Sequence, residues 1–234
     1  LKLSNSSLFN FFVGGLLISI HWYLFFYSIK ISSISLTLSV LSTASLMTSF
    51  LEPLFYKRSF RIHELIFGLI AVVGLVLIFG IQSENYFAIL ISLICTLLSV
   101  LFSLLNGFLI KNRSSSQISF YEIIFGFFII SLIIFFSNIK FPTLSSISLS
   151  NWVYIFILGS LCTAYAFVAS NYILKFITPY TMMMSLNLEP VYGILFSLII
   201  FGEKEYMDIQ FYIGAGIIFL GVIGNIVFKY KKIS

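Results

Sequence analysis

The chain has 234 residues, of which 60% are hydrophobic and only 9% are charged, and its mean hydropathy is +1.10. A soluble domain carries charge on roughly a quarter of its residues, so one water-soluble core could not bury this much apolar surface. The composition therefore places the chain in a lipid bilayer, where only helix bundles and closed barrels are stable. The net charge of +5 comes from basic residues scattered at the ends of apolar runs, which argues against nucleic acid as a partner.

The apolar runs are long and continuous, which favours helices over the alternating strands of a barrel. We predict an all-α polytopic transmembrane helix bundle, whose spans are each close to the ~20 residues that cross a hydrocarbon core. In chain order the eight predicted spans cover residues 8–29, 34–56, 62–81, 86–110, 118–137, 151–174, 180–202 and 209–229. The connections are short, so no separate soluble domain is expected.

The distribution of lysine and arginine predicts the orientation of the spans. One side of the predicted bundle receives most of them, namely Lys2, Lys57, Arg58, Arg61, Lys111, Arg113, Lys175, Lys229, Lys231 and Lys232. The other side receives only Lys30, Lys140 and Lys204. This asymmetry makes the first side cytoplasmic and places both chain ends there.

The last third of the chain repeats its first third. Residues 27–33 are echoed by residues 172–178, and Gly14 matches Gly159 at the same offset. Internal repeats of spanning helices are typical of secondary transporters. Two spans precede the second copy and none precedes the first, so we expect about sixty further residues with two helices upstream. Residues 1–82 would then be an incomplete first repeat of three helices, and residues 83–234 a second repeat of five in the opposite orientation.

Glu189 is the sharpest candidate for a site residue, because it lies in the middle of a predicted span where a charge costs ~2.5–3.5 kcal/mol. It could bind a substrate amine or carry a coupling proton, or it could be a structural acid that braces the helix. Pro190 lacks an N–H group and frees the carbonyl of Leu186, so it predicts a kink there. Asn187 and Tyr192 flank this break; Asn187 could equally bond another helix.

Further polar groups lie inside other spans. His21, Trp22 and Tyr23 offer a titratable ring and two aromatic faces, although a buried, neutral and hydrogen-bonded histidine is the alternative. Asn106, Tyr165 and Asn171 suit either a substrate pathway or interhelical hydrogen bonds. Glu122 is a pathway candidate that could instead pair with Lys111 or Arg113 near the cytoplasmic surface, and Glu52 is expected to pair with Lys57 or Arg58.

Several of these segments resemble the drug/metabolite transporter superfamily, and within it the EamA-type permeases. The resemblance rests on residues 185–193, the Phe201–Glu203 stretch, Gly214 with Gly221, and the first-half stretch from Trp22 to Pro53. It implies helices three to ten of a ten-helix protein with two inverted repeats, a central cavity and alternating access. The chain departs from the pattern at Ser45, which stands where the second repeat has Pro190.

These observations predict a secondary transporter, a permease or exporter, that moves small metabolites such as amino acids or related compounds by alternating access. The alternative is a non-transporting membrane scaffold or a truncated remnant of such a permease. An enzyme is disfavoured because Asp208 is the sole aspartate and His21 and His63 are far apart, which also disfavours a zinc site. We expect no cofactor, a bacterial inner membrane location and lipid contact, and leave a homodimer open.

Overall fold

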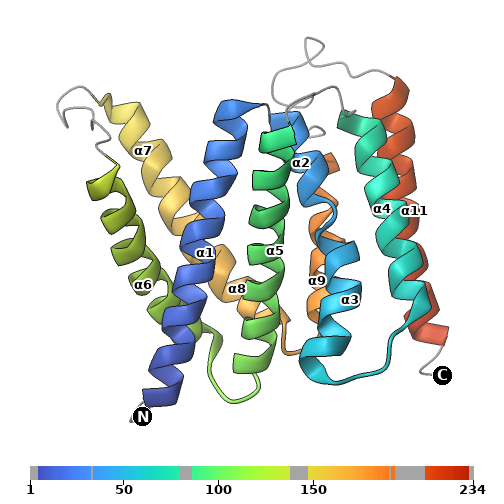
Figure 1. Cartoon of the computed structure of the whole chain (residues 1–234), viewed down its shortest axis with the longest axis horizontal. Coiled ribbons are helices and arrows are strands. Elements are labelled where there is room, and N and C mark those ends of the chain that lie inside the picture. Colours follow the sequence, from blue (N-terminus) through green and yellow to red (C-terminus); the bar gives the residue numbers. More distant parts are fainter. Residues whose placement is uncertain are drawn as a thin grey trace. The chain divides into compact units, whose positions relative to one another are not determined.

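The structure is a computed structural model that describes residues 5–32, 34–79, 86–137, 147–189, 191–192 and 209–231. In these residues every regular element is a helix (Figure 1), which confirms the all-α prediction. The elements are α1 (Asn5–Ile31), α2 (Ile34–Leu41), α3 (Ala44–Tyr56), α4 (Ile62–Phe79), α5 (Tyr86–Leu109), α6 (Ser115–Phe136), α7 (Leu149–Ile157), the π-helix η2 (Leu158–Tyr165), α8 (Ala166–Ile173), α9 (Pro179–Leu186) and α11 (Ile209–Lys231).

Five of the described helical segments are long and apolar enough to cross a membrane: Asn5–Ile31, Tyr86–Leu109, Ser115–Phe136, Leu149–Ile173 and Ile209–Phe228. A shorter apolar helix covers Ile62–Ile78. All six lie where the sequence predicts spans, with small shifts at their ends. The prediction of a polytopic membrane bundle is therefore confirmed.

The span predicted over residues 34–56 is divided into two helices. The N–H of Thr43 donates to the carbonyl of Val40 at 3.0 Å, and its hydroxyl donates to the same carbonyl at 2.7 Å. Serine and threonine side chains compete in this way with the helical backbone ladder. The expectation of one continuous helix is therefore wrong, because this segment breaks between Leu41 and Ala44 without a proline.

The span predicted over residues 151–174 is helical throughout but contains the π-helical segment η2. There the hydroxyl of Thr163 donates to the carbonyl of Leu158, five residues earlier, at 2.8 Å. Neighbouring helices bury none of the most apolar part of this span. π-Helical turns inside α-helices are frequent at functional sites.

The span predicted over residues 180–202 begins as expected, at the N-terminus of α9. Thr178 caps this helix, because its hydroxyl accepts a hydrogen bond from the N–H of Thr181 at 3.3 Å, and Pro179 occupies the first turn. α9 ends at Leu186, and Glu189, Val191 and Tyr192 are again helical. Most of the remainder of the predicted span lies outside the described residues.

The chain divides into two compact units, with the divisions inside α1 and near the end of α5. Unit 1 comprises Leu1–Ile20 and Leu105–Ile177, and unit 2 comprises His21–Leu104 and Thr178–Ser234. Each unit draws on both halves of the sequence. The repeat organisation predicted over residues 1–82 and 83–234 is a different kind of division, and it stays a prediction.

In unit 2, α4 and α11 pack side by side (Figure 1). Gly74 and Gly214 allow this close approach, because a Cβ atom at Gly74 would lie 2.9 Å from the carbonyl oxygen of Gly214. Small residues at crossings of this kind are how membrane helices gain packing energy. α9 adds two neighbouring methionines that enter different apolar clusters, Met184 beside Leu75 and Met183 beside Leu104.

In unit 1, the N-terminal part of α1 packs on α6. The rings of Phe11 and Tyr121 stack with their centroids 5.3 Å apart. A Cβ atom at Gly15 would lie 2.6 Å from the Cβ atom of Phe125. Further along, the hydroxyl of Ser19 lies 3.2 Å from the carbonyl oxygen of Gly126. This tight contact holds the face of α6 that carries Glu122 against α1.

Candidate functional site

The most deeply buried candidate is the carboxyl group of Glu122, on α6 in unit 1. Its side chain is 0% exposed. Oε2 accepts a hydrogen bond from Nδ2 of Asn106, on α5, at 3.2 Å. Oε1 has no hydrogen-bond partner among the described residues. This oxygen points at α1, where a Cβ atom at Gly14 would overlap it.

The absence of a side chain at Gly14 therefore creates the space that the Glu122 carboxyl group occupies. The sequence alternative in which Glu122 pairs with Lys111 or Arg113 does not hold, because the described ion pairs do not include this carboxyl group. A buried charge that lacks a partner lowers the stability of the folded protein. A carboxyl group with one unused oxygen can instead take up a proton or bind a cation.

A second polar pair lies beside Glu122 in the same unit. Nδ2 of Asn171, on α8, donates to the hydroxyl of Ser119, on α6, at 3.0 Å, and both side chains are buried. Ser119 precedes Glu122 by three residues, so the two share one face of α6. Asn106 and Asn171 thus both form the interhelical hydrogen bonds that the sequence left as their alternative. Tyr165, in η2, is 66% exposed and is not part of this cluster.

The aromatic group on α1 belongs to unit 2 and is held by α5. Nδ1 of His21 lies 2.9 Å from the carbonyl oxygen of Cys95. A carbonyl oxygen only accepts, so Nδ1 carries the proton in this contact. Trp22 is half-buried, and Tyr23 stacks on Tyr27 with ring centroids 6.2 Å apart. This arrangement matches the alternative of a hydrogen-bonded histidine.

The helix break on α9 falls near the predicted position. Asn187 follows the last residue of α9 and is buried, and its Nδ2 donates to the hydroxyl of Ser45, on α3, at 3.0 Å. Glu189 is exposed. Tyr192 is 51% exposed. Pro190, which predicted the kink, lies outside the described residues.

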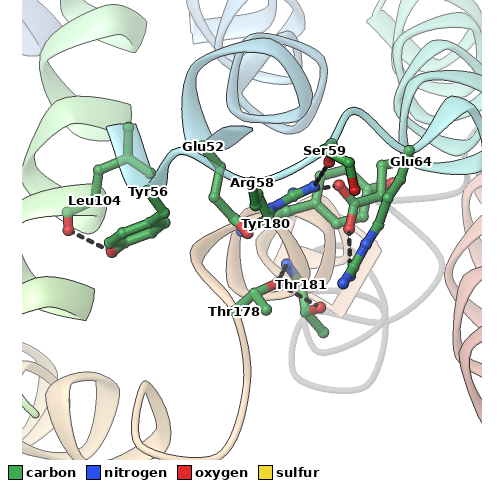
Figure 2. A network of polar contacts seen from close by, with 10 residues as sticks. Glu52, Tyr56, Arg58, Ser59, Glu64, Leu104, Thr178, Tyr180 and Thr181 are labelled. Atoms are coloured by element: carbon green, nitrogen blue, oxygen red, sulfur yellow. Dashed lines mark hydrogen bonds and ion pairs between the residues drawn. The ribbon is translucent and has the colours of Figure 1, made fainter. Parts of the chain in front are cut away.

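A network of charged groups that the sequence only partly predicts connects α3, α4 and α9 in unit 2. Figure 2 shows it around Arg58, whose Nε lies 3.0 Å from Oε1 of Glu52. The other oxygen of Glu52 accepts the backbone N–H of Tyr180 at 2.7 Å. The guanidinium group also pairs with Glu64, and Nη1 of Arg61 lies 3.5 Å from Oε1 of that residue.

The network is close to neutral, since it contains two carboxylates and two guanidinium groups. Glu52 is 1% exposed and Glu64 is 0% exposed. Glu52 also places a negative charge at the N-terminus of α9, where the helix dipole favours it. The pairing of Glu52 with Arg58 was expected from their closeness in sequence. The sequence analysis did not single out Glu64, although its spacing of three residues from Arg61 is a local signal for an ion pair. No local signal indicated Tyr180, which lies 128 positions from Glu52.

Among the described residues, no group of three or more histidine, cysteine, aspartate or glutamate side chains is placed to hold a metal ion. The two cysteines are free thiols, Cys95 buried and Cys162 exposed. The candidate chemistry of the described site is therefore that of a buried carboxyl group with amide and hydroxyl neighbours.

Comparison with known proteins agrees with this architecture. One solved structure, described only as "Crystal structure of protein", superposes with a TM-score of 0.76 at 14% sequence identity, over 94% of this chain and 75% of that chain. At that identity the likeness shows the fold alone. No curated protein matches the chain. The EamA-like transporter family matches residues 86–227, which is more than half of the sequence. The chain is thus an integral membrane protein that belongs to the EamA-like transporter family.

Proposed function

We propose that this protein is a secondary transporter that moves small metabolites, such as amino acids or related compounds, by alternating access. The observation that carries the proposal is the family match over residues 86–227. We further propose a bacterial inner membrane location, from the family and the charge pattern together, and both termini in the cytoplasm, from the asymmetry of the lysine and arginine residues.

The helix pairs of unit 2 support an origin from two repeats. α4 packs on α11 and α3 packs on α9. If residues 1–82 and 83–234 are the two repeats, these are the corresponding helices of each, so the packing fits a two-fold relation between them. Inverted repeats of this kind allow one set of helices to rock against the other around a fixed site.

Within the proposed transporter, Glu122 is the group we assign to substrate or proton binding. The carboxyl group is fully buried and uses one oxygen to accept the Asn106 hydrogen bond, which leaves Oε1 for a cation. A substrate ammonium group or a coupling proton would satisfy that oxygen. Polar groups this deep in a membrane protein generally mark substrate or proton pathways.

The α9 break and the aromatic group on α1, both in unit 2, are further candidates that we propose for the substrate pathway. Asn187 ties the end of α9 to α3 through Ser45, so the chain after Leu186 would bend against a fixed anchor. His21, Trp22 and Tyr23 would offer aromatic surface to a substrate, together with Tyr165 and Tyr192. Asn171 would act indirectly, by fixing the face of α6 that carries Glu122.

The direct test is flux through the purified full-length protein in proteoliposomes. A panel of radiolabelled amino acids would be offered to wild type, E122Q, and E189Q, while trapped pyranine reports proton movement. Glutamine keeps the size of the side chain and can still accept from Asn106, but it can neither carry a proton nor a charge. We expect E122Q to lower flux at least ~10-fold and to abolish its pH dependence, which is the scale of a lost acid–base group.

The flux of E189Q and its dependence on pH test whether Glu189, the main candidate from the sequence, shares the role proposed for Glu122. Flux that E122Q leaves unchanged at every pH would remove Glu122 from the mechanism without affecting the transporter proposal. If well-folded wild type gives no flux above protein-free liposomes for any compound, alternating access would be abandoned in favour of a membrane scaffold.

A further inference from the structure

A cavity with three basic residues opens in unit 1, at the ends of α5 and α8 and the start of α6. Its volume is about 700 Å³. Lys111 and Arg113 come from the α5–α6 connection, and Lys175 follows α8. Lys175 is far from the other two in sequence, so it is the fold of unit 1 that brings all three charges to one cavity.

The polar lining of the cavity carries no acidic side chain among the described residues, and its uncharged members can each donate a hydrogen bond. Asn112, Ser114 and Gln117 line it together with the basic residues. Ser114 is the N-cap of α6, so the positive end of that helix dipole adds to the same field. Positive potential concentrates in a depression lined by charge of one sign.

Two of the cations are held in place by neutral groups. The guanidinium group of Arg113 donates a hydrogen bond to the hydroxyl of Ser7. Nζ of Lys175 lies 5.3 Å from the centroid of the Tyr172 ring. These contacts orient the side chains without cancelling their charge. In contrast, Arg58 and Arg61 are paired with the buried carboxylates of the network in Figure 2.

We propose that this cavity binds a phosphate-bearing anion. The planar guanidinium group matches the geometry of a phosphate, and two ammonium groups supply further charge. The apolar side chains of Ile110 and Leu174 also line the cavity, at the ends of apolar helices where lipid head groups lie. The two sources of this chemistry are therefore the head group of an anionic phospholipid and free inorganic phosphate. The positive-inside rule explains why basic residues gather on one side of the membrane, but it does not require that they line one cavity.

The lipid source is tested by native mass spectrometry of the purified full-length protein, titrated with dioleoylphosphatidylglycerol or with dioleoylphosphatidylcholine. R113Q and K175Q each remove one cavity charge, and K57Q removes an exposed charge from the α3–α4 connection as a matched control. R113K keeps the charge and loses the planar fork. We expect the phosphatidylglycerol affinity to fall about fivefold for each lost cavity cation and to change less than about twofold in K57Q.

The phosphate source is tested by thermal unfolding in sodium phosphate and in sodium chloride of equal ionic strength. If phosphate stabilises wild type, R113Q and K175Q lose this stabilisation, and the protein shows no preference between the two lipids, the site binds a soluble anion. The proposal is overturned if R113Q, K175Q and K57Q behave alike in both arms, or if neither probe distinguishes its anionic form from its control.

Discussion

The charged network between α3, α4 and α9 leads to the most demanding prediction. In R58Q, the guanidinium group that contacts both Glu52 and Glu64 is replaced by a neutral amide. Glu64 keeps the 3.5 Å contact with Arg61, and Glu52 keeps the N–H of Tyr180. Two nearly inaccessible carboxylates would therefore lose the guanidinium group that they share.

The expected loss follows from the burial of these groups. The side chain of Arg58 is 18% exposed, whereas those of Glu52 and Glu64 are 2% and 0% exposed. Removing one partner of a buried ion pair costs ~3–5 kcal/mol of unfolding free energy. Because Arg61 and Tyr180 partly compensate, we expect about 3 kcal/mol.

The assay is a titration of sodium dodecyl sulfate into the protein in mild-detergent micelles, with unfolding followed by the fluorescence of the two tryptophans. K57Q is the matched control, because Lys57 is exposed and adjacent to Arg58; its unfolding free energy should change by less than about 0.5 kcal/mol. R58K should be intermediate, since an ammonium group keeps the charge but not the planar fork.

A double variant separates the ion pair from simple side-chain packing. Adding E64Q to R58Q removes the carboxylate that the first change leaves short of a partner, so the double variant should be more stable than additivity predicts by at least ~1 kcal/mol. Strict additivity, or an R58Q variant as stable as K57Q, would refute the view that Arg58 compensates these buried charges.

Two further pairs of variants each compare a tightly packed glycine with a glycine in open space. G74A places a Cβ atom 2.6 Å from a side-chain carbon of α11, so we expect a loss of ~1–3 kcal/mol in the same assay. G216A meets nothing within 4 Å and should be neutral or gain up to ~1 kcal/mol from helix propensity; equal effects would contradict the packing argument. G14A intrudes on the Glu122 carboxyl group and should lower flux as E122Q does, measured in proteoliposomes. Its repeat counterpart, Gly159, lies in open space, so G159A should transport normally. Normal flux in G14A would show that the space beside Gly14, which the Glu122 carboxyl group occupies, is not needed for transport.

The sequence by itself determined that this is a membrane protein and where most of its helices lie. Hydropathy is a sum over neighbouring residues, so six apolar helices appear at their predicted places whatever packs around them. The pairing of Glu52 with Arg58 could also be predicted from the sequence, because the two residues are close together in the chain.

Only the tertiary structure decided what the polar residues inside those helices contact. Glu122 was expected to reach the surface as an alternative to a pathway role, yet it lies under Gly14 with Asn106 as its donor. The bond from Tyr180 to Glu52 joins residues 128 positions apart. The reason is geometric, since each residue turns the helix by ~100°. A small change in how a helix is rotated against its neighbours therefore moves a side chain from lipid to a partner, and no local pattern records that rotation.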